Sequence, residues 1–209
     1  MVTVCIYIEG GGDAAELKAA CREAFTAFFR KSGLTNRMPK VVACGSRNDA
    51  FDKFRTAVKA ANRKFVNLLL VDSEAPVASG SDVWSHLQQR DGWDRPEGVE
   101  DDSAHLMVQC MEAWFLADRA TLTAYFGNGF NASKLPALPE INGVRDIEAI
   151  AKAQIFESLK QATRETKTKG RYDKGEHSFQ ILAKLDSGKV IAASPHAEKL
   201  IQAIKSRSS

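Results

Sequence analysis

The sequence predicts an α/β protein in which a mostly parallel, Rossmann-like sheet is flanked by helices and followed by a helical C-terminal extension. Two segments, residues 2–8 (VTVCIYI) and 65–71 (FVNLLLV), are largely apolar on both faces, which is typical of strands buried in a parallel sheet. Stretches with helical periodicity lie between them. The resulting β-α-β-α-β order predicts right-handed crossovers that place helices on both faces of the sheet.

Each element of this core has a local signal. The glycines at residues 10–12 end the first strand, and the helix that follows ends near Gly33. A short apolar run predicts the second strand, and phenylalanines at helical spacing predict the next helix. The predicted strands span residues 2–8, 40–44, 65–71 and 105–109, and the predicted helices span residues 13–31, 51–61, 82–90 and 110–126.

Residues 127–209 are predicted to form a helical extension that packs on the α/β core of residues 1–126. Glycine, asparagine and proline indicate a loop over residues 127–139, and three amphipathic helices follow it. Their apolar faces carry Ile147, Ile150, Ile155 and Leu159 in the first helix, Phe179, Leu182 and Leu185 in the second, and Leu200, Ile201 and Ile204 in the third.

The composition is that of a globular protein. Hydrophobic residues make up 44% and charged residues 26% of the 209, which excludes a disordered chain and a disulfide-stapled miniprotein. The longest apolar runs, such as residues 68–71, are far shorter than the roughly 20 residues that span a bilayer, so we expect no membrane association and a cytoplasmic location. Four widely spaced cysteines without a Cys-x-x-Cys pair indicate reduced core thiols. The net charge of +3 is too small to indicate a nucleic-acid partner by itself.

Acidic residues follow two of the predicted strands. Glu9 ends the first strand, and Asp72 and Glu74 follow the third. Carboxylates at one sheet edge repel each other unless a hard divalent cation neutralises them, so we expect Mg²⁺ or Mn²⁺ there. In an extended backbone, Asp72 and Glu74 would point to the same face. Asp13 is a further candidate ligand, although an N-cap role for it is equally compatible with the sequence.

The glycine-rich segment can be compared with two nucleotide-binding motifs. Gly10, Gly12 and Ala15 match the spacing G-x-G-x-x-A after a strand and before a helix. A dinucleotide-binding fold also needs an acid near the end of the second strand, where this chain has residues 44–47 (CGSR). The phosphate loop G-x-x-x-x-G-K-[ST] is absent from the sequence.

The strand that ends in Glu-Gly-x-x-Asp (residues 9–13) and the later strand that ends in Asp-x-acid (residues 72–74) resemble the Toprim domain. Toprim domains occur in topoisomerases, bacterial primases and overcoming-lysogenization-defect nucleases, and the resemblance covers roughly residues 2–74. Residues 111–118 (MEAWFLAD) and 171–174 (RYDK) further resemble an uncharacterised bacterial Toprim-like family encoded beside an ABC-type ATPase in phage-defence loci. This implies a Toprim-like fold and a nuclease subunit whose partner supplies the ATPase.

The resemblance also implies roles for single residues. Glu9 matches the Toprim glutamate that acts as general acid/base or metal ligand, and Asp72 matches the first metal-binding aspartate. Glu74 stands where many Toprim domains have a second aspartate, and Asp13 matches an acid that could support a second metal. Glu112 is a candidate further ligand because its neighbours are apolar, with a solvent-facing position as the alternative. The expected catalytic residues are Glu9, Asp72 and Glu74.

A basic segment near the C-terminus is a candidate nucleic-acid contact. Lys169, Arg171, Lys174 and His177 could bind backbone phosphates, whereas the plainer alternative is a solvated turn before a helix. We therefore expect a Mg²⁺- or Mn²⁺-dependent Toprim-type nuclease that uses water as nucleophile. Its expected partners are nucleic acid, DNA in the first place, an ABC-type ATPase, and a second copy of the chain.

Two other functions fit the same residues. One is a non-catalytic subunit that binds and regulates the ATPase of an anti-phage defence complex. The other is a nucleotide-binding or phosphotransfer protein of flavodoxin-like topology that uses the same strand-end acids.

Overall fold

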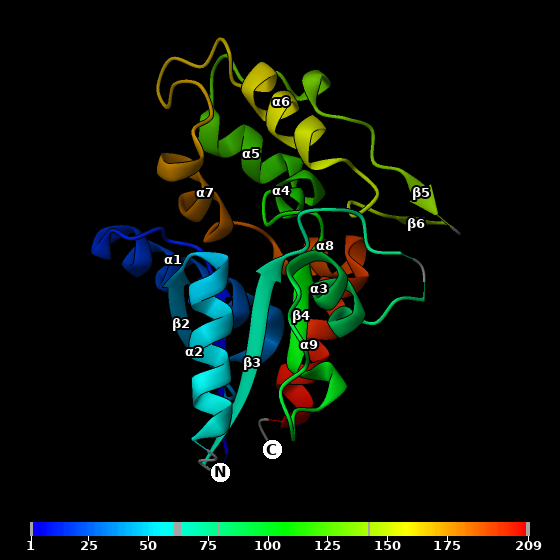
Figure 1. Cartoon of the computed structure of the whole chain (residues 1–209). Helices are drawn as coiled ribbons and strands as arrows, with labels where there is room; N and C mark the ends of the chain where they lie inside the picture. The colour runs from blue at the N-terminus through cyan, green and yellow to red at the C-terminus, as the bar shows by residue number, and fades with distance from the viewer. Residues whose placement is uncertain (1, 61–63, 79, 142, 208–209) are drawn as a thin grey trace.

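The computed structural model describes residues 2–60, 64–78, 80–141 and 143–207 (Figure 1). The strands are β1 (Thr3–Glu9), β2 (Lys40–Gly45), β3 (Phe65–Asp72), β4 (Ala104–Met107), β5 (Glu140–Ile141) and β6 (Val144–Arg145). The α-helices are α1 (Ala15–Phe29), α2 (Arg47–Lys59), α3 (Val83–Asp91), α4 (Ala113–Ala117), α5 (Arg119–Phe126), α6 (Lys152–Ala162), α7 (Lys174–Leu182), α8 (Ser187–Ala193) and α9 (Pro195–Arg207). A π-helical turn (Arg30–Leu34) and two 3₁₀ turns (Asp101–Ser103 and Ala132–Lys134) complete the regular structure of the described residues.

The main sheet has four parallel strands in the order β2-β1-β3-β4. β1 lies in the interior, where Ile6 pairs with Val41 on one side and with Leu68 on the other. Parallel strands need crossover connections, and α1 and α2 supply the first two. The predicted α/β class with a Rossmann-like parallel sheet is confirmed.

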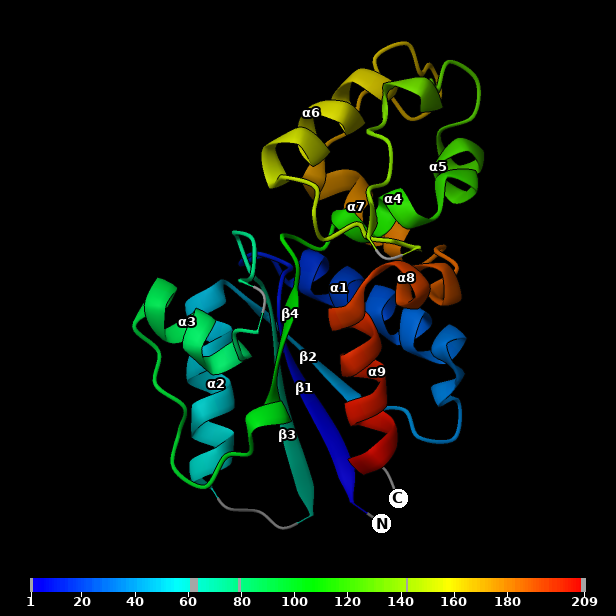
Figure 2. The same ribbon diagram turned by 90° about the vertical axis from the view of Figure 1, so that its right-hand side faces the viewer.

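Helices cover both faces of the sheet (Figure 2). Viewed along its edge, α2 and α3 lie on one side of the sheet and α1 and α9 on the other. The α2–α3 side buries Phe51, Phe54, Trp84 and Leu87. The carboxyl ends of the strands point toward a group of helices, α4 to α7, that stands above the sheet in both views. This arrangement places the strand ends beneath helices from the second half of the chain.

Several helix boundaries follow directly from capping residues. Ser46 accepts a hydrogen bond from the backbone N–H of Asp49 at the start of α2, and Asp82 does the same for Ser85 at the start of α3. Gly92 ends α3 in the left-handed conformation, at φ 69°. The observed α3 lies within one residue of the predicted 82–90, whereas α2 begins four residues before the predicted start at residue 51.

The single helix predicted over residues 110–126 is wrong. It is two helices, α4 and α5, which meet at Asp118 with φ −125° and ψ 71°. Asp118 caps α5 by accepting a hydrogen bond from the backbone N–H of Thr121. It also accepts from the Thr121 hydroxyl, the N–H of Asp186 and the ammonium group of Lys189. These acceptor roles hold Asp118 at the junction, where its backbone is not helical.

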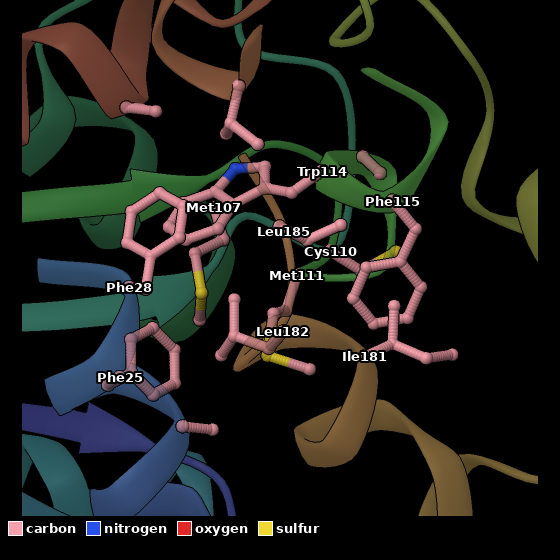
Figure 3. Packing of buried hydrophobic residues seen from close by; sticks show 14 of the residues in the cluster. Phe25, Phe28, Met107, Cys110, Met111, Trp114, Phe115, Ile181, Leu182 and Leu185 are labelled. Atoms are coloured by element: carbon pink, nitrogen blue, oxygen red, sulfur yellow. The ribbon is translucent and has the colours of Figure 1, made fainter. Parts of the chain in front are cut away.

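The extension also departs from the prediction. Ile147 and Ile150 are buried, but they precede α6 rather than lying on it. The helix α8 and the short antiparallel pair β5–β6 were not predicted. One core cluster runs from β1 and α1 through α4 and α7 to α9, so apolar residues from before and after residue 126 share one interior. Figure 3 shows this packing around Trp114, with Phe28 of α1 and Leu182 of α7 nearby.

The four cysteines at residues 5, 21, 44 and 110 are free and buried, as expected for core thiols. Within the described residues, none of the helices has both the length and the apolar character needed to cross a bilayer.

His105 on β4 predicts a pH-dependent loss of stability. It is 5% exposed, and burial, followed by the nearby Arg207, lowers its pKa to about 4, against the opposing effect of Asp102 and a small further effect of His196. An unfolded histidine has a pKa of about 6.5, so between these values the unfolded chain binds more protons and stability falls as pH falls. We expect the His105 contribution to unfolding free energy to drop by about 2 kcal/mol from pH 7 to pH 5. Urea unfolding of wild type and His105→Asn at both pH values measures this.

The informative quantity is the difference between the two proteins in their pH 7 to pH 5 change, because the substitution also alters absolute stability. Equal changes in wild type and variant would show that His105 is not held neutral by the fold.

Candidate functional site

Three carboxylates meet at the carboxyl edge of the sheet. Glu9 is the last residue of β1 and Asp72 is the last residue of β3, and these strands are neighbours. Glu74 follows two residues later. One oxygen from each carboxylate lies within 4.8 Å of the others. The structure thus brings together the three acids that were predicted as catalytic residues.

Glu74 reaches this cluster by a different geometry from the expected one. The strand ends at Asp72, and Glu74 has φ 64°, so the extended alternation expected between the two residues is wrong. The N–H of Glu74 donates to the carbonyl of Gln109 at 2.9 Å, and its carboxylate lies 2.5 Å from the ammonium group of Lys152. A positive φ is costly for a residue with a side chain and is concentrated at functional sites.

Asp72 is the most enclosed acid of the cluster, at 4% exposed. Its Oδ1 accepts a hydrogen bond from the N–H of Met111 at 2.9 Å, while its own N–H donates to Oε2 of Glu9 at 3.1 Å. Burial, and then the carboxylates of Glu9 and Glu112, raise the pKa of Asp72 well above its ordinary value. Burial also raises the pKa of Glu9, against the effect of Arg47 and of the Asp72 N–H. Burial therefore makes it costly for Glu9 and Asp72 to be ionised side by side.

Arg47 is a member of the site that the sequence analysis did not identify. Its guanidinium lies 3.4 Å from Oε2 of Glu9, donates to the carbonyl of Asp72, and donates to both oxygens of Asp91 at 3.0 and 2.6 Å. It also lies over the ring of Trp93, 5.0 Å from the centroid. Because Arg47 begins α2 directly after β2, the strand-end rule that found Glu9 and Asp72 could also have found Arg47.

A cavity of about 240 Å³ opens beside the acids. Glu9 and Asp72 form part of its wall, together with the glycine segment at residues 10–12. A Cβ on Gly45 would lie 2.6 Å from the carbonyl oxygen of Gly12, and one on Gly11 would lie 2.8 Å from Cα of Lys18, so neither glycine tolerates a side chain. The remaining lining residues are Leu17, Gly45, Met107, Met111, Lys174, Gly175, Ser178 and Phe179.

The first part of α7 also lines the cavity, and a buried acid holds it in place. Glu112 is fully buried, and its Oε1 accepts hydrogen bonds from the hydroxyls of Ser178 at 3.1 Å and Tyr172 at 3.4 Å. The ammonium group of Lys174 lies 3.6 Å from the same oxygen. Burial alone would lower the pKa of Lys174, but Glu112 and then Asp72 raise it above its ordinary value, so Lys174 presents a positive charge at the cavity.

The other predicted site residues lie apart from the acidic cluster. Asp13 is exposed, and α1 begins after Ala14 rather than after a cap from Asp13. Among the described residues, the group of acids able to share one ion contains neither Asp13 nor Glu112. Lys169 and Arg171 are outside the cavity lining, and Lys169 lies over the ring of Tyr125 at 5.0 Å.

His177 was expected to bind phosphate, but it is 1% exposed and both of its ring nitrogens are engaged. Its Nδ1 accepts a hydrogen bond from the N–H of Asp173 at 2.9 Å, and its Nε2 lies 3.1 Å from the carbonyl of Lys169. His177 therefore fixes the turn before α7 and leaves Lys174 as the cation of this segment that faces the cavity.

The donor set fits a hard divalent cation. All three ligand candidates are carboxylates, which Mg²⁺ and Mn²⁺ prefer. Asp72, Glu9 and Glu74 would hold the ion. Lys174 and Gly175, in the first turn of the nine-residue α7, would face an anion beside it. Carboxylates beside a cationic side chain are the groups that metal-assisted reactions on phosphate esters use.

Comparison with known proteins gives one family. A family model described as a domain of unknown function (DUF4276) matches residues 8–205 of the chain. No curated protein and no solved structure matches the chain. The matched segment contains the whole acidic cluster and every residue that lines the cavity.

Proposed function

We propose that the chain, which belongs to the family described as a domain of unknown function (DUF4276), is a Mg²⁺- or Mn²⁺-dependent nuclease that hydrolyses phosphodiester bonds in nucleic acid. The observation that carries this proposal is the convergence of Glu9, Asp72 and Glu74, because Glu9 and Asp72 line a cavity that Lys174 also lines. Strand-end acids at such a sheet edge, facing a positive group, suit a phosphate ester that approaches with a cation. The resemblance of residues 9–13 and 72–74 to Toprim motifs supports the same reaction.

Each residue has a role in the proposed reaction. A bound divalent ion supplies polarisation of the scissile phosphate and a lowered pKa for the attacking water. Asp72, Glu74 and one oxygen of Glu9 would hold the ion, and the Glu9 carboxylate, whose Oε2 accepts the Asp72 N–H, would take the proton that the attacking water loses. Lys174 binds a phosphate oxygen and stabilises the charge that develops on it. Arg47 keeps Glu9 oriented toward the cavity through its own anchor on Asp91.

The cellular role is proposed from the resemblance alone. It implies a cytoplasmic effector subunit of an ATPase-coupled anti-phage defence system, with an ABC-type ATPase as partner and DNA as the first candidate substrate. The four free cysteines are in keeping with a reducing compartment.

A non-catalytic regulatory subunit is the second candidate, and one observation favours it. Arg47 pairs with Glu9, and Lys152 lies 2.5 Å from Glu74, so two of the three acids already have cationic partners. In that case the cluster is a structural network, and a divalent ion would gain little by entering it.

Cation binding decides between the two candidates. We expect excess Mn²⁺ to stabilise the wild-type chain by about 2.7 kcal/mol at a concentration 100 times the dissociation constant, which is several degrees in Tm at this chain length. Asp72→Asn should abolish the rise, because an amide replaces the most enclosed ligand. Thermal unfolding with and without Mn²⁺ measures both.

Asp52→Asn is the matched control, because Asp52 is exposed on α2 and lies outside the cluster. Its Mn²⁺-dependent rise should equal that of the wild type. If Mn²⁺ has no effect on the wild type, or the same effect on Asp72→Asn, the metal-dependent nuclease is contradicted and the regulatory subunit is favoured.

A further inference from the structure

The cavity beside the acids is lined by two chemically different sets of residues. Glu9, Asp72 and Lys174 bring charge to it. The other set is apolar, and a cation or phosphate group gains nothing from it. Its side chains come from α1, the end of β4, the segment before α4, and α7, and they are Leu17, Met107, Met111 and Phe179.

Phe179 is the aromatic residue of the apolar set, and its ring contacts the glycine segment. A Cβ on Gly10 would lie 3.4 Å from Cζ of Phe179 and 3.3 Å from Sγ of Cys21, so the ring lies directly against the glycine backbone. Phe179 is partly buried and packs on the main core cluster. Its ring is thus a fixed aromatic surface, five residues after Lys174 on the same helix.

The size of the cavity limits what can enter. At about 240 Å³ it is smaller than the roughly 300–1,000 Å³ of sites that enclose drug-sized ligands. It has room for a single unit of a polymer and none for a stacked base pair. In a duplex, a base is paired and stacked, and it reaches such a cavity only after being turned out of the helix at a cost of a few kcal/mol.

Resting on the proposed function, we propose that this cavity takes one unpaired nucleotide and that the substrate class is single-stranded nucleic acid. The phosphate lies between Lys174 and the acids, and the base lies against Phe179 and the methionines. Aromatic rings bind unpaired bases with little sequence preference, because every base has a π-face. An intact duplex keeps its bases paired, so its phosphates contact only the charged lining residues.

The segment before α7 suits the neighbouring phosphates of such a strand. Lys169 and Arg171 precede α7, and the carbonyl of Lys169 is tied to the ring of His177 inside the helix. The backbone of this segment is therefore held beside the end of α7 that lines the cavity. Contacts of this kind add affinity that depends on salt but not on sequence.

The test uses the intact chain and three fluorescent probes in the presence of Ca²⁺, which takes the same oxygen ligands. The probes are a single-stranded 12-mer, the same sequence as a blunt duplex, and a 12-mer of abasic units with the same phosphates. Fluorescence anisotropy should show the single strand bound about 10-fold more tightly than either of the other two.

Protein variants locate the effect. Phe179→Ala should weaken single-strand binding about 10-fold and change duplex binding less than twofold, and Phe179→Leu, which keeps an apolar side chain of similar bulk, should lose most of the same advantage. Tm values of both variants establish that they fold. The Mn²⁺-dependent rise in Tm should stay at the wild-type value in both, since neither substitution touches a carboxylate.

Each outcome separates this inference from the proposed function. Equal affinity for the single strand and the abasic probe, with the Mn²⁺ rise intact, overturns the unpaired-nucleotide site and leaves the metal-dependent nuclease standing. A single-strand advantage that survives in a folded Phe179→Ala variant places the base elsewhere and also overturns it. Absence of a Mn²⁺-dependent rise in Tm in the wild type contradicts the proposed nuclease function.

Discussion

Replacing Glu9 by glutamine is expected to slow metal-dependent phosphodiester cleavage by about 10²- to 10⁴-fold while the chain stays folded. Glutamine keeps a carbonyl oxygen that accepts the N–H of Asp72, now made by Glu9 at 3.1 Å, so the strand ends remain joined. The amide carries no negative charge for the cation and accepts no proton. Initial rates on a single-stranded oligonucleotide, with Tm measured beside them, test this.

Glu16→Gln is the matched control, because Glu16 undergoes the same chemical change in the exposed first turn of α1. It should cleave at the wild-type rate. If Glu9→Gln and Glu16→Gln cleave equally fast, the acidic cluster takes no part in the reaction. Arg47 remains anchored on Asp91 in the Glu9 variant, so a large fall in Tm is not expected.

Replacing Trp114 by alanine is expected to reduce the free energy of unfolding by about 3–5 kcal/mol, a large part of the 5–15 kcal/mol of an ordinary domain. Trp114 on α4 is fully buried, stacks on Phe28 of α1 at 4.9 Å between ring centroids, and meets Phe25 edge-on at 6.3 Å (Figure 3). The variant loses the packing of α4 against α1. Urea unfolding at pH 7 measures the difference.

Trp114→Phe separates packing from polarity. The indole N–H of Trp114 is buried and has no hydrogen-bond partner, so its removal loses no hydrogen bond. Phenylalanine keeps an aromatic face for Phe28, and the expected cost is about 1.5 kcal/mol or less. A similar loss in Trp114→Phe and Trp114→Ala would mean that stacking between α1 and α4 is not what stabilises this junction.

The part of the site that was predictable comes from the sheet. Glu9 and Asp72 directly follow apolar strands, and the carboxyl ends of parallel strands share one edge, so their approach followed from the strand assignments alone. Arg47 obeys the same rule at the end of β2. The sequence analysis did not identify it because residues 44–47 were compared only with the acid of a dinucleotide-binding fold, and Arg47 is a cation.

The second half of the chain was harder to predict because its geometry depends on distant partners. Lys152 reaches Glu74 across 78 positions of sequence, and the first turn of α7 faces the acids only through the fold of the intervening helices. The break at Asp118 has the same origin. Its carboxylate binds the N–H of Asp186 and the ammonium group of Lys189, and no local periodicity encodes these contacts.

The return of α9 to the sheet sets an order for folding during translation. Leu200, Ile201 and Ile204 share a core cluster with Ile6 of β1, and Arg207 is bonded to Glu100 and to the carbonyl of Asp102 just before β4. At 5–20 residues per second, the ribosome makes α9 roughly 5–20 s after β4. For that interval the part of this face that α9 covers, over β4, is exposed in the nascent chain. Holdase chaperones should therefore bind this nascent chain until residues 195–207 leave the exit tunnel.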